Sequence, residues 1–381
     1  MVSWPYALVP ILLVETSTAF YRGPAKFVFL PIQSQKQFSN TSFVECNKTL
    51  AEYQQRYDEH LSWRAIANAC NRHQNCILTN TDENGKAYSG SAALLIGLTP
   101  MLLSSIGPTI SELGLLSLNR PILTLLLVAG TAAIYPSRVL SYSENSPSEL
   151  LARPPIINKA IVTTLQGNHR LRLLISALQY LMVMAAVVNV SLAAWELGKG
   201  TVSSFQCQVS YLPLLWTLLP LAVYLSAAIA SRLAETTSAR TEEQGSPTVG
   251  SRSGRLLHWL TRELKPGATQ ATIRRTLLRE RLSVAIWLGV ASALAFVHSI
   301  FGIFVFSSLL FGMIVDALVL LLRFVASVFI CRLVIIFEIS CMRAAASMPN
   351  TCAGSYEAAS GSQIILSAYR STDGGTVRDT E

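Results

Sequence analysis

The chain has 381 residues, of which 51% are hydrophobic and only 14% are charged. Soluble domains carry roughly a quarter charged residues, so a protein built only of soluble domains is excluded. The formal net charge is +8. A basic chain can bind nucleic acid, but here the densest basic block lies between stretches apolar enough to cross a membrane. We therefore expect a lipid bilayer and no nucleic acid as its partner.

The N-terminal residues 1–20 are a possible secretory signal peptide. Ser17-Thr18-Ala19 places small residues at both recognition positions of a cleavage site. However, Glu15 interrupts the apolar stretch and the basic start of most signal peptides is missing. The sequence leaves open whether this segment is removed.

Residues 21–91 form a polar N-terminal region that is too charged to span a membrane. Two glycosylation sequons lie in it, at Asn40 and at Asn47. Both are candidate glycosylation sites if this region enters the secretory lumen. The region is therefore predicted to be extracytoplasmic.

Six apolar segments follow, each about as long as a membrane-crossing helix requires. They cover residues 92–110, 117–136, 173–195, 211–231, 283–306 and 313–340. Backbone groups in lipid must bond within their own segment, so the prediction is an all-α polytopic bundle of about six transmembrane helices in residues 92–343. The first two segments are short and contain prolines, which predicts that they are kinked or only partly inserted.

The loop 232–282 is the most basic part of the chain and is predicted to be cytoplasmic. Ten of the 30 Lys and Arg residues lie in it, against five acidic residues. Within it, residues 255–281 combine apolar stripes with arginines. This pattern suits either a helix on anionic lipid headgroups or an ordinary packed loop helix. The tail 344–381 is rich in Ser and Gly and is predicted to be disordered.

The predicted topology has a parity problem. The loop 137–172 also has an excess of basic residues, which places it in the cytoplasm with the loop 232–282. Two full crossings before residue 137 would then return residues 21–86 to the cytoplasm, whereas the sequons favour the outside. Either one of the first two segments is re-entrant or surface-lying, or the N-terminal region is cytoplasmic and the sequons arise by chance.

Four cysteines are disulfide candidates: Cys46, Cys70, Cys76 and Cys207. The first three are an odd number, and Cys207 in the next outward loop makes two disulfides possible, with three alternative pairings. Cys46, Cys70 and Cys76 together with His73 also provide zinc ligand types. Their spacing matches no common zinc module, so disulfides are favoured and no metal is predicted.

The sequence carries no recognisable enzyme motif. It lacks a phosphate-binding loop, a dinucleotide fingerprint, a His-Glu-x-x-His pair and a nucleophile elbow. No catalytic residue and no cofactor are therefore assigned. Whether the protein is an enzyme stays open, with a non-enzymatic role favoured.

Polar residues inside the last segments are the candidate functional cluster. On a helix of 3.6 residues per turn, Asp316, Arg323 and Glu338 fall within about 60°, with Arg332 on the far side. A charge near mid-bilayer costs several kcal/mol unless it is paired or hydrated, so Arg323 is expected to face the bundle interior.

Partners for these charges are expected on two other segments. His298 is a candidate partner for Asp316 or Arg323, and Asn189 a further member of the cluster. The cluster is either a substrate or proton site, or a set of bonds that fixes helix packing. Arg332 and Glu338 lie near the cytoplasmic end, where they are expected to snorkel to the interface.

Four stretches of the chain are distinctive: LLIGLTPMLLSSIGPTISELGLLSLNRP (94–121), AIYPSR (133–138), CNRHQNCIL (70–78) and the apolar stretch 298–339. In these stretches the chain resembles a family of uncharacterised multi-pass membrane proteins of filamentous ascomycete fungi. The resemblance covers most of residues 60–343 and implies a polytopic fold. It implies no activity and no site residue.

Two functions are expected from these features. The first is a transporter-like or accessory membrane protein, with a polar cavity lined by His298, Asp316 and Arg323. The second is a membrane sensor or scaffold, with a dry bundle and a folded N-terminal region. Its location would be the plasma membrane or an endomembrane, and its protein partner is unknown. The sequence shows no internal repeat, which weakens the transporter interpretation.

Overall fold

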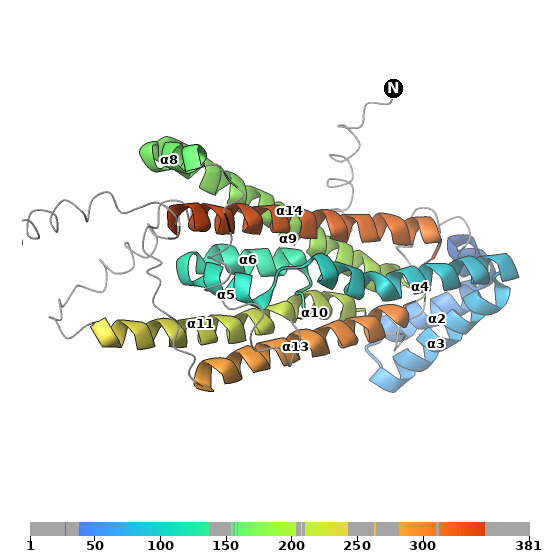
Figure 1. Ribbon diagram of the computed structural model, residues 1–381. Helices are drawn as coiled ribbons and strands as arrows, with labels where there is room; N and C mark the ends of the chain where they lie inside the picture. The colour runs from blue at the N-terminus through green and yellow to red at the C-terminus, as the bar shows by residue number, and fades with distance from the viewer. Residues whose placement is uncertain are drawn as a thin grey trace, which may run out of the picture.

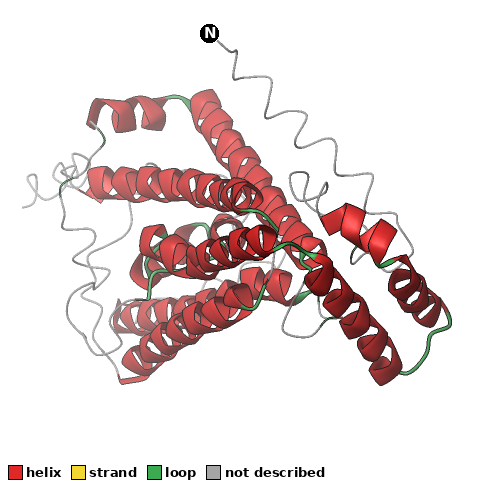
Figure 2. Ribbon diagram, turned by 90° about the vertical axis from the view of Figure 1, so that its right-hand side faces the viewer, coloured by secondary structure: helices red, strands yellow, loops and turns green. Residues whose placement is uncertain are grey.

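The computed structural model describes residues 38–136, 159–202, 210–242, 282–309 and 312–346, together with Phe27, Pro154, Ile157, Cys207 and Glu263. Within these residues every regular element is a helix, and the long helices lie side by side (Figures 1 and 2). The chain is thus an all-α polytopic helix bundle, as predicted.

Three short helices form an N-terminal unit at one end of the bundle: η4 (Thr41–Glu45), α2 (Asn47–Asp58) and α3 (Trp63–Asn80). The bundle itself contains nine helices within the described residues. They are α4 (Glu83–Ile106), α5 (Ile110–Asn119), α6 (Pro121–Thr131), α8 (Lys159–Gly167), α9 (His169–Gly200), α10 (Leu212–Leu218), α11 (Pro220–Glu242), α13 (Leu282–Ser307) and α14 (Ile314–Ala346).

Five stretches of described helix are long and apolar enough to cross a membrane. They are Glu83–Ile106, His169–Gly200, Leu212–Leu233, Ser283–Ser307 and Ile314–Ala344. Large apolar side chains on their outer faces are exposed, and Leu94, Leu181 and Phe304 are 68%, 70% and 71% exposed. Such surfaces are stable in lipid rather than in water, so the chain is a multi-pass integral membrane protein in a bilayer.

The second predicted segment, 117–136, does not cross the bundle. It contains the end of α5 and the short helix α6, whose Gly130 approaches Ala186 and Cys331. These two neighbours lie near the middle of α9 and α14, which shows that α6 reaches only half of the bundle's depth. This arrangement agrees with the alternative in which one of the first two segments is re-entrant. Which side of the membrane residues 21–86 face stays a prediction.

Two interruptions of the chain meet where α6 ends. α4 ends before Gly107, and Pro108 and Thr109 separate it from α5. The backbone N–H of Tyr135 donates to the carbonyl oxygen of Pro108 at 2.9 Å. Gly107 is needed at this contact because a Cβ there would lie 2.8 Å from the carbonyl oxygen of Ala133. Non-helical backbone at this depth persists only where protein or water surrounds it.

The bundle therefore has two chemically different ends. We call the end that carries α2, α3 and the α9–α10 connection the disulfide end. We call the opposite end, where α8 packs against the C-terminal part of α14, the loop end (Figure 1). Both predicted cytoplasmic loops, 137–172 and 232–282, reach the loop end through the helices that border them.

Several predicted segments fall wholly or partly outside the described residues. The possible signal peptide, 1–20, lies outside them. So does the tail from residue 347, although α14 continues the helix to Ala346, beyond the predicted boundary at 344. Of residues 255–281 only Glu263 is described, so the predicted contact with anionic lipid headgroups stays a prediction.

Substituting Gly302→Ala in α13 should destabilise the bundle. The added Cβ would lie 2.3 Å from Trp216 Nε1 and 2.8 Å from Pro100 Cβ, so two buried groups would have to move. Overpacking of this kind costs about 1–3 kcal/mol. The matched control is Gly289→Ala on the same helix, where nothing lies within 4 Å. In detergent, we expect Gly302→Ala to have a lower melting temperature than the unchanged protein and Gly289→Ala to have the same one. Equal melting temperatures for the two variants would contradict the packing described.

Candidate functional site: the charges of the helix bundle

The predicted cluster of Asn189, His298, Asp316 and Arg323 is divided between different contacts. Asn189 and Arg323 do meet, between α9 and α14. His298 bonds to Trp216 instead, and Asp316 lies in the first turn of α14. The hydrogen bonds of His298 lead to Trp216 and those of Arg323 to Asn189 and Glu196, and the lining of one cavity by His298, Asp316 and Arg323 stays a prediction.

Arg323 forms an interhelical cluster with α9, which we call the Arg323 cluster. Its Nε donates to Asn189 Oδ1 at 3.1 Å, and its Nη1 pairs with Glu196 Oε2. Asn189 Nδ2 donates to the main-chain oxygen of Arg323 at 2.9 Å and to Ser327 Oγ at 2.8 Å. The side chains of Arg323 and Glu196 are 16% and 27% exposed, so this ion pair is only partly enclosed.

Glu196 was missed from the sequence because α9 is longer than its apolar segment. The predicted helix ended at residue 195, which placed Glu196 in a loop, but α9 continues to Gly200. A spacing of seven residues from Asn189 places both side chains on the same helical face. From that spacing, Glu196 could have been identified in the sequence as a partner for Arg323.

The second intramembrane ion pair joins Glu112 to Arg332 and lies near the break between α4 and α5. Glu112 closes a capping box at the start of α5: Thr109 N donates to Glu112 Oε2 at 2.9 Å, and Glu112 N donates to Thr109 Oγ1 at 3.3 Å. Arg332 Nη1 of α14 donates to the same Oε2. The carboxylate thus ties α14 to the first turn of α5 and caps a helix inside the bundle.

The third pair is enclosed completely and forms what we call the Arg120 cluster. Arg120 stands between α5 and α6, and its Nη1 donates to Glu338 Oε1 at 2.8 Å and to Gln179 Oε1 at 2.6 Å. Nη2 donates to Ser176 Oγ at 2.7 Å, and Gln179 Nε2 donates to Glu338 Oε1 at 2.6 Å. The side chains of Arg120 and Glu338 are both 0% exposed.

The prediction that Glu338 snorkels to the interface is therefore wrong. Its distance from the helix end suggested access to water, but the α5–α6 corner covers that end of α14 and brings Arg120 to it. A buried carboxylate persists when it is paired and hydrogen-bonded, as this one is. Arg332, the other residue expected to snorkel, is 29% exposed and paired with Glu112.

His298 and Trp216 join α13 to α10 by two reciprocal hydrogen bonds. Trp216 Nε1 donates to the carbonyl oxygen of His298 at 3.2 Å, and His298 Nε2 donates to that of Trp216 at 3.1 Å. The rings are stacked with centroids 5.0 Å apart, and Phe306 packs edge-on against the indole. This environment makes His298 a packing residue in the core rather than the partner of Asp316 or Arg323.

All four candidate cysteines form disulfides, in the pairs Cys46–Cys76 and Cys70–Cys207. The first joins η4 to α3, and the second joins α3 to the α9–α10 connection. Closing loops of this length stabilises a fold by about 3–5 kcal/mol each in the chain-entropy account. Among the described residues no group of three or more His, Cys, Asp or Glu side chains is placed to hold a metal.

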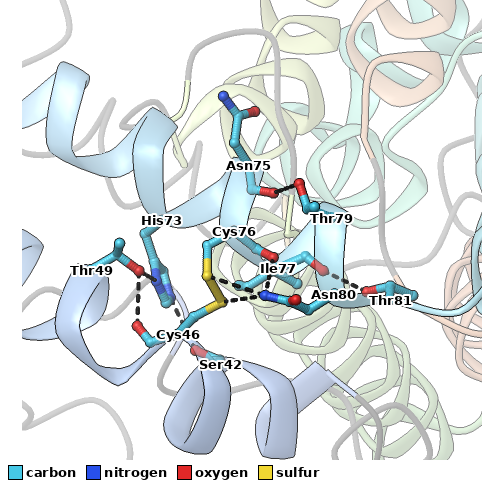
Figure 3. The surroundings of a disulfide bond; sticks show 10 residues. All are labelled: Ser42, Cys46, Thr49, His73, Asn75, Cys76, Ile77, Thr79, Asn80 and Thr81. Atoms are coloured by element: carbon cyan, nitrogen blue, oxygen red, sulfur yellow. Dashed lines mark hydrogen bonds between the residues drawn. A yellow bond between two sulfur atoms is a disulfide. The ribbon is translucent and has the colours of Figure 1, made fainter.

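His73 lies beside the first disulfide but takes part in hydrogen bonds rather than metal binding (Figure 3). Thr49 donates its hydroxyl to the Cys46 carbonyl, so His73 Nδ1 donates to Thr49 Oγ1 at 2.9 Å. His73 Nε2 then accepts from Ser42 Oγ at 3.0 Å. Both ring nitrogens are thereby satisfied in the neutral form, and burial lowers the pKa of His73 to about 4.

The two glycosylation candidates are exposed on the same unit. Asn40 precedes η4 and Asn47 begins α2, and both side chains face solvent. A glycosylated asparagine has to be exposed in the folded protein, and both asparagines meet this requirement. Their modification stays a prediction.

Comparison with known proteins adds no relative from which an activity can be carried over. The chain matches no protein-family model, no curated protein and no solved structure. The resemblance to the fungal membrane proteins therefore stays a prediction, and the chemistry of the bundle has to be argued from its own residues. Within the described residues, those side chains include the α14 ion pairs of Arg323, Arg332 and Glu338, which lie at different depths.

The N-terminal unit should lose stability as the pH falls from about 6.5 to about 4. In that window the unfolded chain binds a proton at His73 that the folded unit does not, which costs up to about 3 kcal/mol. His73→Gln should flatten this dependence, measured by hydrogen exchange of α3 against pH. The control His60→Asn changes an exposed histidine at a positive φ that Asn tolerates. An unchanged pH dependence in His73→Gln would contradict the assignment.

Proposed function

We propose that this protein is a transporter-like or accessory membrane protein rather than an enzyme, and that it handles a small polar or charged solute. The observation that carries the proposal is the meeting of two chain interruptions, Gly107–Thr109 and Ala132–Tyr135, halfway through the bundle. Transporters commonly bind solutes where interrupted helices leave backbone groups at mid-membrane. A protein that serves only as an anchor has no need for such interruptions, which are costly to bury.

The Arg323 cluster is the part of the bundle best suited to contact a solute. Its guanidinium and the Glu196 carboxylate are partly exposed, whereas the Arg120–Glu338 pair is sealed. An ion pair of this kind can exchange partners with a zwitterionic solute, because the solute's acidic group replaces Glu196 at Arg323 and its basic group binds Glu196. No charge is then left unpaired in the membrane at any stage.

The disulfide end would face away from the cytoplasm. Disulfides form and persist in oxidising compartments, and two of them hold the N-terminal unit together and join it to the α9–α10 connection. The basic loops 137–172 and 232–282 would share the cytoplasmic side at the loop end, in line with their charge. Five crossings between an outside N-terminus and an inside C-terminus are consistent with both.

A sensor or scaffold is the second candidate. It is favoured by the separately crosslinked N-terminal unit and by the dry packing of Trp216 against His298 and Phe306. In that case the Arg323 cluster would fix helix packing, and Arg323→Leu would alter folding rather than solute binding. The two candidates therefore differ in what the Arg323 variants should do.

Solute binding is tested with purified protein screened for thermal stabilisation by amino acids, dicarboxylates, inorganic phosphate and polyamines. Solutes that stabilise the protein are then followed for uptake into proteoliposomes. We expect stabilisation by a zwitterionic or charged solute, lost in Arg323→Leu and Glu196→Gln but kept in Arg64→Leu, which removes an exposed arginine of α3. Because Arg323→Leu breaks a partly buried pair, its own stability should fall by about 1–3 kcal/mol.

Two results would contradict the transporter proposal. One is that no member of the panel stabilises the protein. The other is that Arg323→Leu responds to the solute as the unchanged protein does. The scaffold would be favoured if Arg323→Leu is less abundant, if the double variant Arg323→Leu/Glu196→Leu regains normal abundance, and if neither variant responds to a solute.

The proposed orientation is tested by labelling sealed membranes with an impermeant maleimide. Ser62→Cys lies in the exposed turn between α2 and α3, and Ser146→Cys and Ser251→Cys lie in the two basic loops. We expect Ser62→Cys to react from the extracytoplasmic side, and the other two only after permeabilisation. Labelling of either loop from the same side as Ser62→Cys would overturn the topology.

A further inference from the structure

One residue of the long basic loop, Glu263, is buried against helices that are distant from it in sequence. Glu263 lies between the end of α11 at Glu242 and the start of α13 at Leu282, and only 4% of its surface is exposed. It packs at the corner of α5 and α6 against the Arg120 cluster. An acidic residue from a basic loop is thus enclosed at the loop end.

Three donors converge on Glu263. Leu123 N donates to its Oε1 at 2.9 Å and Tyr180 Oη donates to the same oxygen at 2.8 Å. Arg120 Nε donates to its main-chain carbonyl oxygen at 2.9 Å. The guanidinium of Arg120 also lies 5.4 Å from the centre of the Tyr180 ring, so the donors support one another. Only Leu123 N–H and the Tyr180 hydroxyl reach the carboxylate itself, and we call these two donors, with the Arg120 guanidinium beside them, the oxyanion seat.

The seat has the chemistry that proteins use for carboxylate and phosphate groups. Leu123 is in the first turn of α6, where backbone N–H groups have no partner within the helix and the helix dipole favours negative charge. The Tyr180 phenol next to this terminus is the second donor to the oxyanion. The Arg120 guanidinium lies beside it but donates to Glu338, Gln179, Ser176 and the main-chain oxygen of Glu263. In the structure a carboxylate occupies it, which shows the group that the seat accepts.

Glu263 fits the seat incompletely. Both side-chain hydrogen bonds reach Oε1, while Oε2 is buried and has no hydrogen-bond partner among the described residues. A buried carboxylate oxygen without a partner costs free energy, because four lone-pair positions of the group seek donors. An external carboxylate or phosphate is not tethered to a main chain, so it is free to take other orientations at the two donors.

We propose that Leu123 N–H and Tyr180, beside Arg120, form a binding site for an oxyanion, which Glu263 fills from within the chain and which an external carboxylate or phosphate group fills in its place. The ligand is either a soluble anion or the phosphate of an anionic lipid at the loop end. The site is separate from the Arg323 cluster, and the proposal does not depend on transport.

The test removes the internal ligand and supplies an external one. Full-length Glu263→Ala is purified, and its melting temperature is measured with sodium acetate, with sodium phosphate and with sodium chloride at equal ionic strength. We expect acetate or phosphate, but not chloride, to raise the melting temperature of Glu263→Ala by several degrees. The unchanged protein should gain little, because its seat is filled.

Lipid is distinguished from soluble anions in nanodiscs. If phosphatidylglycerol stabilises Glu263→Ala more than phosphatidylcholine does, and neither acetate nor phosphate stabilises it, the ligand of the seat is a lipid headgroup. Tyr180→Phe in the Glu263→Ala background removes one donor and should weaken the apparent affinity for the effective anion about tenfold. Glu59→Ala, which removes an exposed carboxylate of the N-terminal unit, is the matched control and should show no anion-specific response.

The proposal is overturned if Glu263→Ala responds to acetate, phosphate and anionic lipid no more than the unchanged protein does. It is also overturned if Tyr180→Phe leaves the response unaltered. If Glu263→Ala yields no folded protein, Glu263→Asp is tested in the same way. The aspartate side chain is one methylene shorter, so its carboxylate would not reach the two donors and would leave them open to an external anion. Absence of an anion-specific gain in that variant would equally refute the seat.

Discussion

A charge inside a bilayer costs several kcal/mol unless it is paired, and this constraint organises the bundle around α14. That helix carries Arg323, Arg332 and Glu338, and each is bound to a different element. Arg323 and Glu338 fall on the face toward α9 and α6, and Arg332 on the opposite face toward α5, as a helix of 3.6 residues per turn requires. Lipid packing provides little force between apolar helices, so such pairs determine which helices meet and at what depth.

The helical hairpin formed by α5 and α6 is held to α14 by two of these ion pairs. Glu338 holds Arg120 at the corner where α5 turns into α6, and Arg332 holds Glu112 at the first turn of α5. Between these points the chain leaves and re-enters helical structure in the interior, where each backbone group has to be satisfied by protein. The bond from Tyr135 N to Pro108 O closes the arrangement. The ion pairs Arg120–Glu338 and Arg332–Glu112 thus lie on both sides of the interruption on which the proposed transport role rests.

The sequence predicted the class of fold well because twenty-residue apolar segments have one stable solution in lipid. It also identified the prolines that mark the first two segments as abnormal, and the four cysteines that pair. Their pairing was not predictable, since four cysteines allow three connectivities and only the folded α3 brings Cys70 to Cys207.

The candidate site was predicted less well, for reasons of helix length and tertiary contact. Helical spacing placed Arg323 in the interior, but its partner Glu196 lay one residue beyond the apolar segment. Arg120 lies near the start of the predicted segment 117–136 and was given no role. Glu263 lies in the loop predicted to be cytoplasmic, within residues 255–281, and was also given no role. Neither has any local pattern that indicates burial, because both are enclosed by elements distant in sequence.

The most direct test of this account is a double-mutant cycle on the Arg120–Glu338 pair, measured as the free energy of unfolding in mixed micelles. Arg120→Met and Glu338→Met each leave a buried charge without its main partner, and each should lose about 3–5 kcal/mol. The double variant should lose much less than the sum of the two, with a coupling energy of at least about 2 kcal/mol. Additive losses would show that the buried pair does not hold the α5–α6 corner to α14 and would contradict the account.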